Sequence, residues 1–493
     1  MSIHSVDISL DNVDSKETFE HSVILLKGKV TCQENCCKAL LNGKISVSIE
    51  SEVFDFDVKE GRFKCIVELE LGLNFLKIIY NNDLHLGQYT LTLERKSSLC
   101  DKVLKLLYVV PKGESGEFQS VQTCSNSAES ACKRITTGVK LLQCLVSERL
   151  SELGLGKKTF NLFTQNEKEE CEVFYSQHTK EEFFSCTGEG IWIMTARELL
   201  NKGIFAHGVK VLAFLSCTKY FEETNEIKGY VACGRGHLAM VSSSGLHSWA
   251  SNVSSVVSCL TSPIPIDSSL LDDSGFRGTL GGCYATTLGA ALHEMGHVFD
   301  LVHSDFGVMA RGFEELDIFF TVGNPQPRHQ PKIEAKGRTC CGGQEISVRA
   351  QPPTKVTSIS FGFRSMGTDK EYKEWDRDGK AYFHRSAAVL LSGHPWFGEC
   401  RQQEDKGPVQ IIGLEVKVPN GLRLIELHTE DDRLVKYWDF TKNPTKIHRY
   451  CLSLFDVKDI IQPSVLVQDV TGKIVTHKLN LNAFLIPPVN LTD

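Results

Sequence analysis

The segment around residue 295 holds the residues best suited to catalysis. It contains His293, Glu294 and His297 in the pattern H-E-x-x-H. On an α-helix, side chains four positions apart lie about 40° apart around the axis and one turn along it. His293 and His297 therefore face the same way and can bind one metal ion. Glu294 would stand beside that ion without binding it, where a carboxylate can take a proton from metal-bound water and pass it to a leaving amine.

A third ligand is expected, because a catalytic zinc ion usually has three protein ligands and a water molecule. Our candidate is His303. In a continuous helix it would lie about 240° around from His297 and point away from the metal, so the helix must end near residue 300. Asp300 occupies the turn, where glycine is usual because it adopts positive φ at little cost. Aspartate tolerates that conformation better than most other residues.

The surroundings of these residues are predicted from the same segment. Met309 follows His303 by six positions. It either gives the site an apolar floor or is an ordinary core residue. Thr286 or Thr287 is expected to cap the helix. The buried side of the helix is expected to consist of Leu288, Ala291, Leu292, Met295 and Phe299.

The whole string, H-E-x-x-H-x-x-D-x-x-H followed by G-V-M-A, resembles the metzincin clan of zinc endopeptidases. That clan has H-E-x-x-H-x-x-G-x-x-H and a Met-turn. The sequences LHEMGHVFDLVHS and GVMARGF more closely resemble a family of zinc metallopeptidases whose fungal members carry a C-terminal jacalin-like lectin domain. The resemblance covers roughly residues 100–397. It implies one Zn²⁺ bound by His293, His297 and His303, with Glu294 as general base and Met309 as the Met-turn methionine.

The resemblance also implies a substrate-binding strand. Residues 236–244 resemble the edge strand that pairs with extended peptides in metzincins. Within it, the predicted substrate-binding residues are Gly236, His237, Leu238, Ala239 and Met240. Phe313 lies where some metzincins have a tyrosine that contacts zinc or the oxyanion. The implied reaction is hydrolysis of a peptide bond in a peptide or protein substrate.

Other interpretations stay open. In thermolysin-like enzymes the third ligand is a downstream glutamate, for which Glu314 and Glu315 are the nearest candidates. Ligand roles are also conceivable for His237, His247 and His394. A protein of another class would use the zinc to stabilise a non-catalytic interaction module. The intact Glu294 argues against that class, because a structural site needs four closed ligands and no base.

The flanking sequence predicts a multidomain α+β protein. Residues 1–97 hold short runs rich in β-branched and aromatic residues, which favour an antiparallel β-sandwich. Residues 98–398 alternate strands and helices and are predicted to form the metzincin-like zinc peptidase domain, with a surface insertion at about 321–356. Strand-like runs return in 399–493, which predicts a C-terminal β-sandwich-like domain. Jacalin-like character and glycan binding there rest on the resemblance alone.

Individual elements are predicted within the central region. A helix is expected from about Ile135 to Leu153, with Gly154 as its C-terminal stop. Apolar runs at Gly190–Met194 and Val209–Phe214 suggest strands. A further helix is expected from about Glu371 to Leu391.

Composition excludes several classes of protein. The chain has 493 residues, a net charge of −7 and no block of like charge, which argues against a nucleic-acid partner. No apolar stretch approaches the roughly 18 residues of a membrane span. The N-terminus does not resemble a secretory signal, so we expect a cytoplasmic protein, with unconventional secretion still open. Its 18 cysteines are accordingly expected to be mostly reduced, buried thiols.

Overall fold

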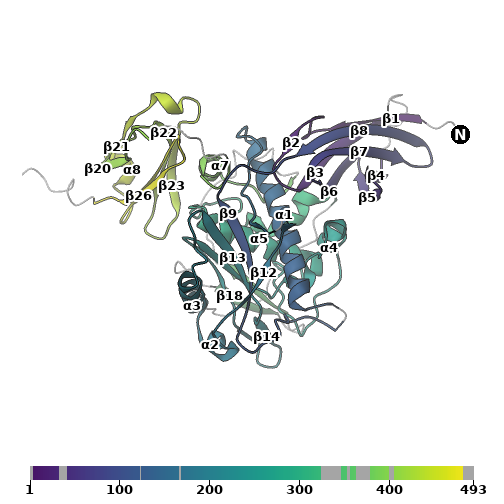
Figure 1. Ribbon diagram of the computed structural model, residues 1–493, viewed down its shortest axis with the longest axis horizontal. Coiled ribbons are helices and arrows are strands. Elements are labelled where there is room, and N and C mark those ends of the chain that lie inside the picture. The colour runs from purple at the N-terminus through teal and green to yellow at the C-terminus, as the bar shows by residue number, and fades with distance from the viewer. Residues whose placement is uncertain are drawn as a thin grey trace, which may run out of the picture.

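The computed structural model shows a mixed α/β architecture with β-rich parts at both ends (Figure 1). Within the described residues, no helix is long and apolar enough to cross a membrane. The residues that the structure describes are 4–32, 41–122, 124–165, 168–323, 346–351, 356–361, 378–398 and 405–480.

The N-terminal part is one eight-stranded sheet. Its order is β1-β3-β6-β5-β4-β7-β8-β2, and an added β1–β8 pairing closes the sheet on itself. The pairings β1–β8 and β2–β8 are parallel, so the predicted antiparallel arrangement is wrong for these two pairs of strands. Side chains alternate along the strands, which buries Phe56 and Val58 in the interior. The strands are β1 (His4–Leu10), β2 (Thr18–Phe19), β3 (Val23–Cys32), β4 (Gly43–Ile49), β5 (Glu52–Lys59), β6 (Arg62–Glu68), β7 (Gly72–Asn81) and β8 (His85–Arg95).

The central part is built on a five-stranded sheet of order β12-β9-β13-β17-β16. Four strands are parallel, and β16 runs antiparallel beside β17. Residues 104, 106 and 108 of β9 point to one face and residues 107 and 109 to the other, each into a separate core. The strands are β9 (Val103–Val110), β12 (Glu172–Tyr175), β13 (Val209–Leu215), β16 (Ala232–Arg235) and β17 (Leu238–Ser242).

Helices cover both faces of this sheet. The core on one face contains α1 (Ala128–Glu152) and α5 (Leu280–Val298), and the core on the other contains α2 (Lys180–Ser185) and α3 (Gly188–Asn201). The predicted stop of α1 is confirmed: Gly154 has a φ of 71° and its N–H donates to Ser151. The predicted strand Val209–Phe214 lies within β13.

The strand predicted at Gly190–Met194 is wrong, because these residues belong to α3. The hydroxyl of Thr187 caps that helix by accepting from the N–H of Gly190. Its buried positions, 191, 195, 198 and 199, have helical spacing. A five-residue apolar run did not distinguish a strand from part of an amphipathic helix.

Short elements complete the central part. They include α4 (Val256–Leu260), α6 (Leu316–Phe320) and α7 (Arg385–Gly393). Of the helix expected over residues 371–391, residues 371–377 lie outside the described part. Within the described residues α7 begins only at Arg385, later than predicted. The remaining elements are β10 (Thr164–Gln165), β11 (Lys168–Glu169), β14 (Lys219–Phe221), β15 (Glu226–Lys228), η1 (Leu246–Ser248), η2 (Val253–Ser255), η3 (Gly312–Glu315), β18 (Ile346–Gln351) and β19 (Val356–Phe361).

The insertion predicted at 321–356 is only partly described. β18 lies inside that range and pairs antiparallel with β19, which begins at its end. The rest of the range, 324–345 and 352–355, lies outside the described residues.

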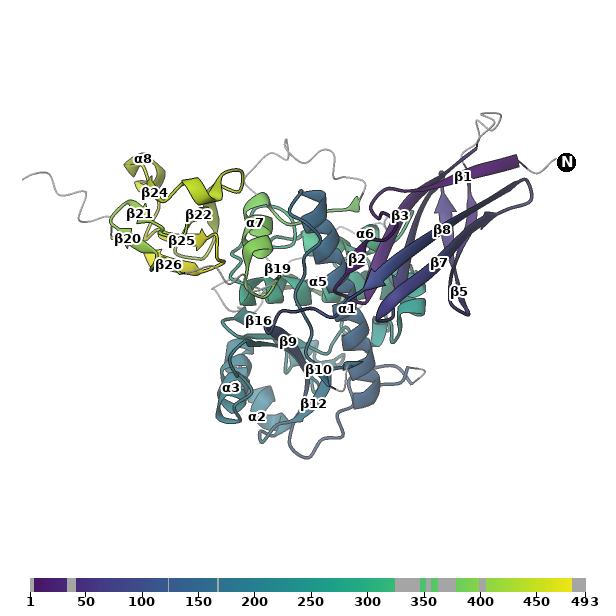
Figure 2. The same cartoon turned by 45° about the horizontal axis from the view of Figure 1, so that its top comes forward.

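The C-terminal β region, residues 405–480, forms a three-stranded sheet (β20-β21-β24) and a four-stranded sheet (β23-β22-β25-β26) with its own core. Figure 2 shows α7 between this region and α1. Its elements are β20 (Gln410–Ile412), β21 (Glu415–Lys417), β22 (Leu422–His428), β23 (Leu434–Asp439), η5 (Pro444–Lys446), β24 (Arg449–Cys451), α8 (Leu454–Val457), β25 (Ser464–Asp469) and β26 (Ile474–Lys478).

Twelve of the described cysteines form no disulfide, and six of these are buried, so the prediction of mostly buried thiols holds for half of them. Cys233 in β16 is disulfide-bonded, which departs from that prediction.

Candidate metal centre

Helix α5 carries the H-E-x-x-H pattern on a rigid, buried support. Its cap is Thr279, whose hydroxyl accepts from the N–H of Gly282. The predicted caps are wrong, because Thr286 and Thr287 lie two turns inside the helix. Their hydroxyls instead accept from Arg277 (2.9 Å) and from the indole of Trp249 (2.8 Å). These bonds tie the helix to neighbouring segments.

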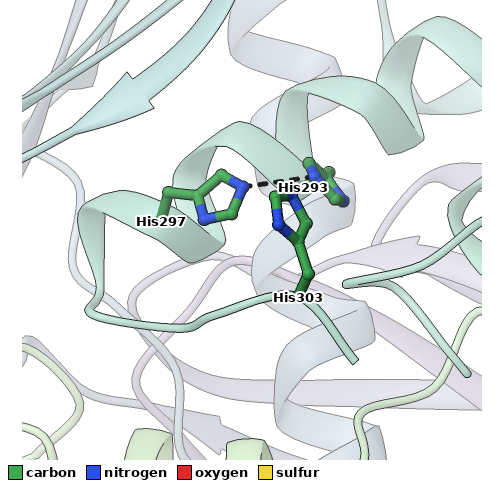
Figure 3. Close-up of side chains that lie close together, drawn as sticks. All are labelled: His293, His297 and His303. Atoms are coloured by element: carbon green, nitrogen blue, oxygen red, sulfur yellow. Dashed lines mark hydrogen bonds between the residues drawn. The ribbon is translucent and has the colours of Figure 1, made fainter. Parts of the chain in front are cut away.

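The helix ends as predicted near residue 300. Asp300 has a φ of 64°. The N–H of Leu301 donates to Gly296, and the N–H of Asp300 donates to His297. These two bonds form a Schellman motif with an aspartate where glycine is usual. The turn reverses the chain, so that His303 returns toward the helix face that carries the other two histidines (Figure 3).

Three imidazoles meet at this point. Within the described residues, His293, His297 and His303 form the one group of three whose ligand atoms could hold a metal, with those atoms within 4.8 Å of one another. His293 Nδ1 lies 2.9 Å from the carbonyl oxygen of Val308, and His297 Nδ1 lies 3.0 Å from that of Leu301. A carbonyl oxygen only accepts, so both Nδ1 atoms carry the proton and both Nε2 atoms present a lone pair.

The two Nε2 atoms fit a shared cation. They lie 3.2 Å apart, the contact drawn as a dashed line in Figure 3. Two lone pairs repel at that distance, whereas two nitrogens bound to one tetrahedral zinc ion are about 3.3 Å apart. Burial, and then the neighbouring imidazoles, holds the pKa of His293 well below its usual value and lowers that of His303 to about 3. Neutral imidazole is the form that binds metals, so the donor set fits zinc.

Met309 packs against α5 at Gly296, the residue before His297. It is buried, and a Cβ placed on Gly296 would come within 2.5 Å of its Sδ atom. A Cβ on Gly289 would meet the carbonyl oxygen of Phe313 at 1.9 Å. Both glycines therefore let the segment that follows His303 pack directly on α5. Gly282, Gly289 and Gly296 recur every seven residues, a signal in the sequence that our prediction did not use.

Glu294 faces the sheet. It is buried. β16 packs so closely on α5 here that a Cβ on Gly234 would lie 1.9 Å from the backbone carbonyl oxygen of Glu294. Burial raises the pKa of Glu294 to about 8, while the backbone N–H of Gly234 acts in the opposite direction. A cation held by the histidines would also lower that pKa, because it stabilises a nearby carboxylate.

The prediction that residues 236–244 form an edge strand is wrong. Leu238, Ala239 and Met240 belong to β17, which lies between β13 and β16 and is buried. Gly236 and His237 form the preceding turn, where Gly236 has a φ of 59°. The edge strand on this side of the described sheet is β16, which packs against α5. A pattern of alternating residues cannot say which of two adjacent strands lies outside.

The alternative ligands lie outside the metal centre. The carboxylate of Glu314 accepts from Arg311, and that of Glu315 accepts from the N–H of Lys380. Phe313 is buried with its ring 5.4 Å from that of His293, so it packs against a candidate ligand. The three other histidines contact the carbonyl oxygen of Val209 (His237), the thiol of Cys283 (His247) and the carboxylate of Asp300 (His394).

His303 is held by a distant part of the chain. Its N–H donates to the carbonyl of Asp432 (3.0 Å), and its carbonyl accepts from the N–H of Leu434 (2.9 Å). These bonds form a parallel bridge between His303 and Arg433, in the turn between β22 and β23. Nothing in the sequence pattern indicates this contact, because the partners are about 130 positions apart.

Comparison with known proteins identifies the family of this chain. Residues 7–349 match a family described as "Putative peptidase family". The chain belongs to that family. It is 24% identical over 338 residues to a protein of Schizosaccharomyces pombe and 24% identical over 355 residues to one of Saccharomyces cerevisiae, both named as putative zinc metalloproteinases. Each match covers 64% of this chain, and the chain spans 54% and 49% of those relatives.

Similar solved structures include two of OgpA from Akkermansia muciniphila. The wild-type structure is 11% identical, with a TM-score of 0.41, and the match covers 78% of this chain and 95% of that one. A catalytically inactive form in complex with an O-glycopeptide substrate is 10% identical, with a TM-score of 0.41, and covers 78% and 94%.

Proposed function

We propose that this protein is a zinc-dependent endopeptidase. The observation that carries the proposal is the convergence of His293, His297 and His303 through their ring nitrogens, with a buried glutamate, Glu294, on the same helix. Membership in a peptidase family and the names of the two yeast relatives support the reaction class. The three-histidine set, and Met309 packed against Gly296 of the same helix, favour a metzincin-type centre.

Each residue has a defined task in this proposal. Zinc bound by the three histidines would supply a Lewis acid that polarises the scissile carbonyl and makes a water molecule more acidic. Glu294 accepts the proton of the attacking water and passes it to the leaving amine. The carbonyls of Val308 and Leu301 fix the ring orientation of His293 and His297.

The substrate is proposed to bind as an added strand. β16 pairs with β17 on one side and ends the described sheet on the other. An extended peptide that continues the sheet beside β16 lies next to α5, which carries Glu294. This replaces the earlier assignment to Gly236–Met240. Glycan binding by the C-terminal β region stays a prediction of the resemblance.

The test is peptide cleavage by the zinc-loaded protein. Wild type and His303→Ala are incubated with a broad peptide library, and products are identified by mass spectrometry. We expect internal cleavage by wild type, inhibition by a zinc chelator and restoration by added zinc. A wild-type protein that binds one zinc ion per chain and cleaves no peptide would contradict the proposal and favour a zinc-stabilised binding module.

A further inference from the structure

The loop between β22 and β23 reaches the metal centre. His303 lies in a parallel bridge with Arg433, formed through the carbonyl of Asp432 and the N–H of Leu434. One residue of the three-histidine group is thus held through both its backbone N–H and its carbonyl by the C-terminal β region. The other two histidines are held by α5 itself.

This loop is internally braced. The N–H of Thr429 donates to the carbonyl of Arg433, and the N–H of Arg433 donates to the hydroxyl of Thr429. The carboxylate of Asp431 accepts from the Thr429 hydroxyl (2.5 Å) and from the Arg433 guanidinium (2.9 Å). Asp432 completes the turn with a φ of 54°. The loop therefore presents its carbonyl and N–H groups to His303 in a defined orientation.

The sheet behind the loop is anchored on the central part. Gln468 donates to the carbonyl of Leu390 (2.9 Å), and Arg423 donates to the hydroxyl of Ser392 (2.7 Å), both in α7. Leu424 and Leu466 are buried in the same core as α1 and α5. The position of the loop is consequently set by the docking of the whole C-terminal β region.

We propose that the β22–β23 loop is part of the metal centre and that zinc binding is coupled to docking of the C-terminal β region. The coupling rests on the proposed zinc site. Because coupling is reciprocal, zinc stabilises the docked loop by the same factor by which docking tightens zinc. A partner that pulls the C-terminal β region away would therefore release the third ligand and switch off the site.

The test removes one backbone bond to His303. β23 is an edge strand, and the N–H of Leu434 points away from its sheet toward His303, where proline is tolerated. Leu434→Pro deletes that donor, and Leu434→Ala is the matched control that keeps it. Zinc affinity is measured by competition with a chromophoric chelator. We expect Leu434→Pro to weaken zinc about 10–100-fold and Leu434→Ala by less than about 3-fold.

A second variant and a second readout guard against misfolding. Asp432→Val strains the turn, whereas Asp432→Asn removes the charge and keeps the conformation. Hydrogen exchange of residues 429–434 in full-length wild type, with and without zinc, reports docking directly. We expect zinc to slow exchange at Leu434.

Equal zinc affinity in wild type, Leu434→Pro and Asp432→Val, or exchange that is unchanged by zinc, would overturn the coupling. A wild type that binds zinc with these effects but cleaves no peptide leaves the coupling standing and overturns the peptidase proposal. A wild type that binds no zinc overturns both.

Discussion

The carboxylate of Asp300 lies 3.1 Å from Nε2 of His394. Asp300 has a positive φ and occupies the C-terminal turn of α5, while the His394 side chain is almost fully buried. Burial raises the pKa of Asp300, but hydrogen bonding to His394 and the charges of His394 and Lys210 outweigh this and lower it. Lys210 also donates to the carbonyl of Val298 at the helix end. An aspartate therefore stands where glycine is usual because its side chain ties the turn to its surroundings.

Substitutions at Asp300 should separate the cost of the strained backbone from the contribution of the hydrogen bond to His394. Asp300→Ala loses the bond and keeps the strain, so we expect a loss of about 2–3 kcal/mol in the free energy of unfolding. Asp300→Gly loses the bond but relieves the strain, and should be about 1 kcal/mol more stable than the alanine variant. Urea denaturation measures both. An alanine variant as stable as wild type would show that the His394 contact contributes nothing.

Gly296 and Met309 should be energetically coupled. Gly296→Ala places a methyl group against the Met309 sulfur and should destabilise the protein by about 1–3 kcal/mol. Met309→Ala alone should leave a cavity and destabilise it by about 2–5 kcal/mol. In the double variant the new methyl group occupies part of that space, so the loss should be smaller than the sum. A strictly additive double-mutant cycle would contradict the direct contact.

The close approach of β16 to α5 predicts that replacing Gly234 by a residue with a side chain strongly destabilises the protein. A Cβ there would overlap the carbonyl oxygen of Glu294, and backbone on both sides cannot yield. We expect Gly234→Ala to lose more than about 2 kcal/mol of stability. Gly236→Asn, in the adjoining turn, is the control: its site is open and asparagine tolerates positive φ. Similar melting temperatures for the two variants would contradict the packing described.

His21 should make stability depend on pH. Burial, and then the charges of Lys157 and Arg95, lowers its pKa to about 3. The unfolded chain takes up a proton near pH 6.5 and the folded protein does not, so stability is complete above that value and falls below it. The slope approaches about 1.4 kcal/mol per pH unit. His21→Phe should remove this pH-dependent part of the free energy of unfolding. Denaturation at pH 7.5 and 5.0 measures the free energy of unfolding of both proteins. An equal loss of stability between the two pH values in wild type and variant would refute the assignment to His21.

The local features of the site could be predicted from the sequence because they follow helix geometry. The spacing of His293 and His297 and the need for a turn before His303 together predicted positive φ at Asp300, which the structure shows. These inferences used only the angle per residue and the cost of left-handed backbone. The assignment of the three histidines and Glu294 to zinc chemistry stays a prediction.

Features that depend on distant contacts were wrong or missed. Thr286 was predicted as a cap because its hydroxyl suits that role, but Arg277 uses that hydroxyl inside the helix. The edge strand was predicted at residues 236–244, which contain β17, whereas the edge of the described sheet on this side is β16. Strand order depends on which strands pair, and composition does not reveal that pairing. The bridge from His303 to Arg433 is made of backbone groups that every residue carries, so no side-chain pattern marks it.

The central claim, a zinc-peptidase centre with Glu294 as its base, is tested most directly by Glu294→Gln. The amide keeps the shape of the side chain but cannot accept the proton of water. We measure zinc content and peptide cleavage on the same preparations of wild type and variant. The account predicts one zinc ion per chain in both, with cleavage about 10²–10⁴-fold slower in the variant. Equal cleavage by both proteins would contradict it.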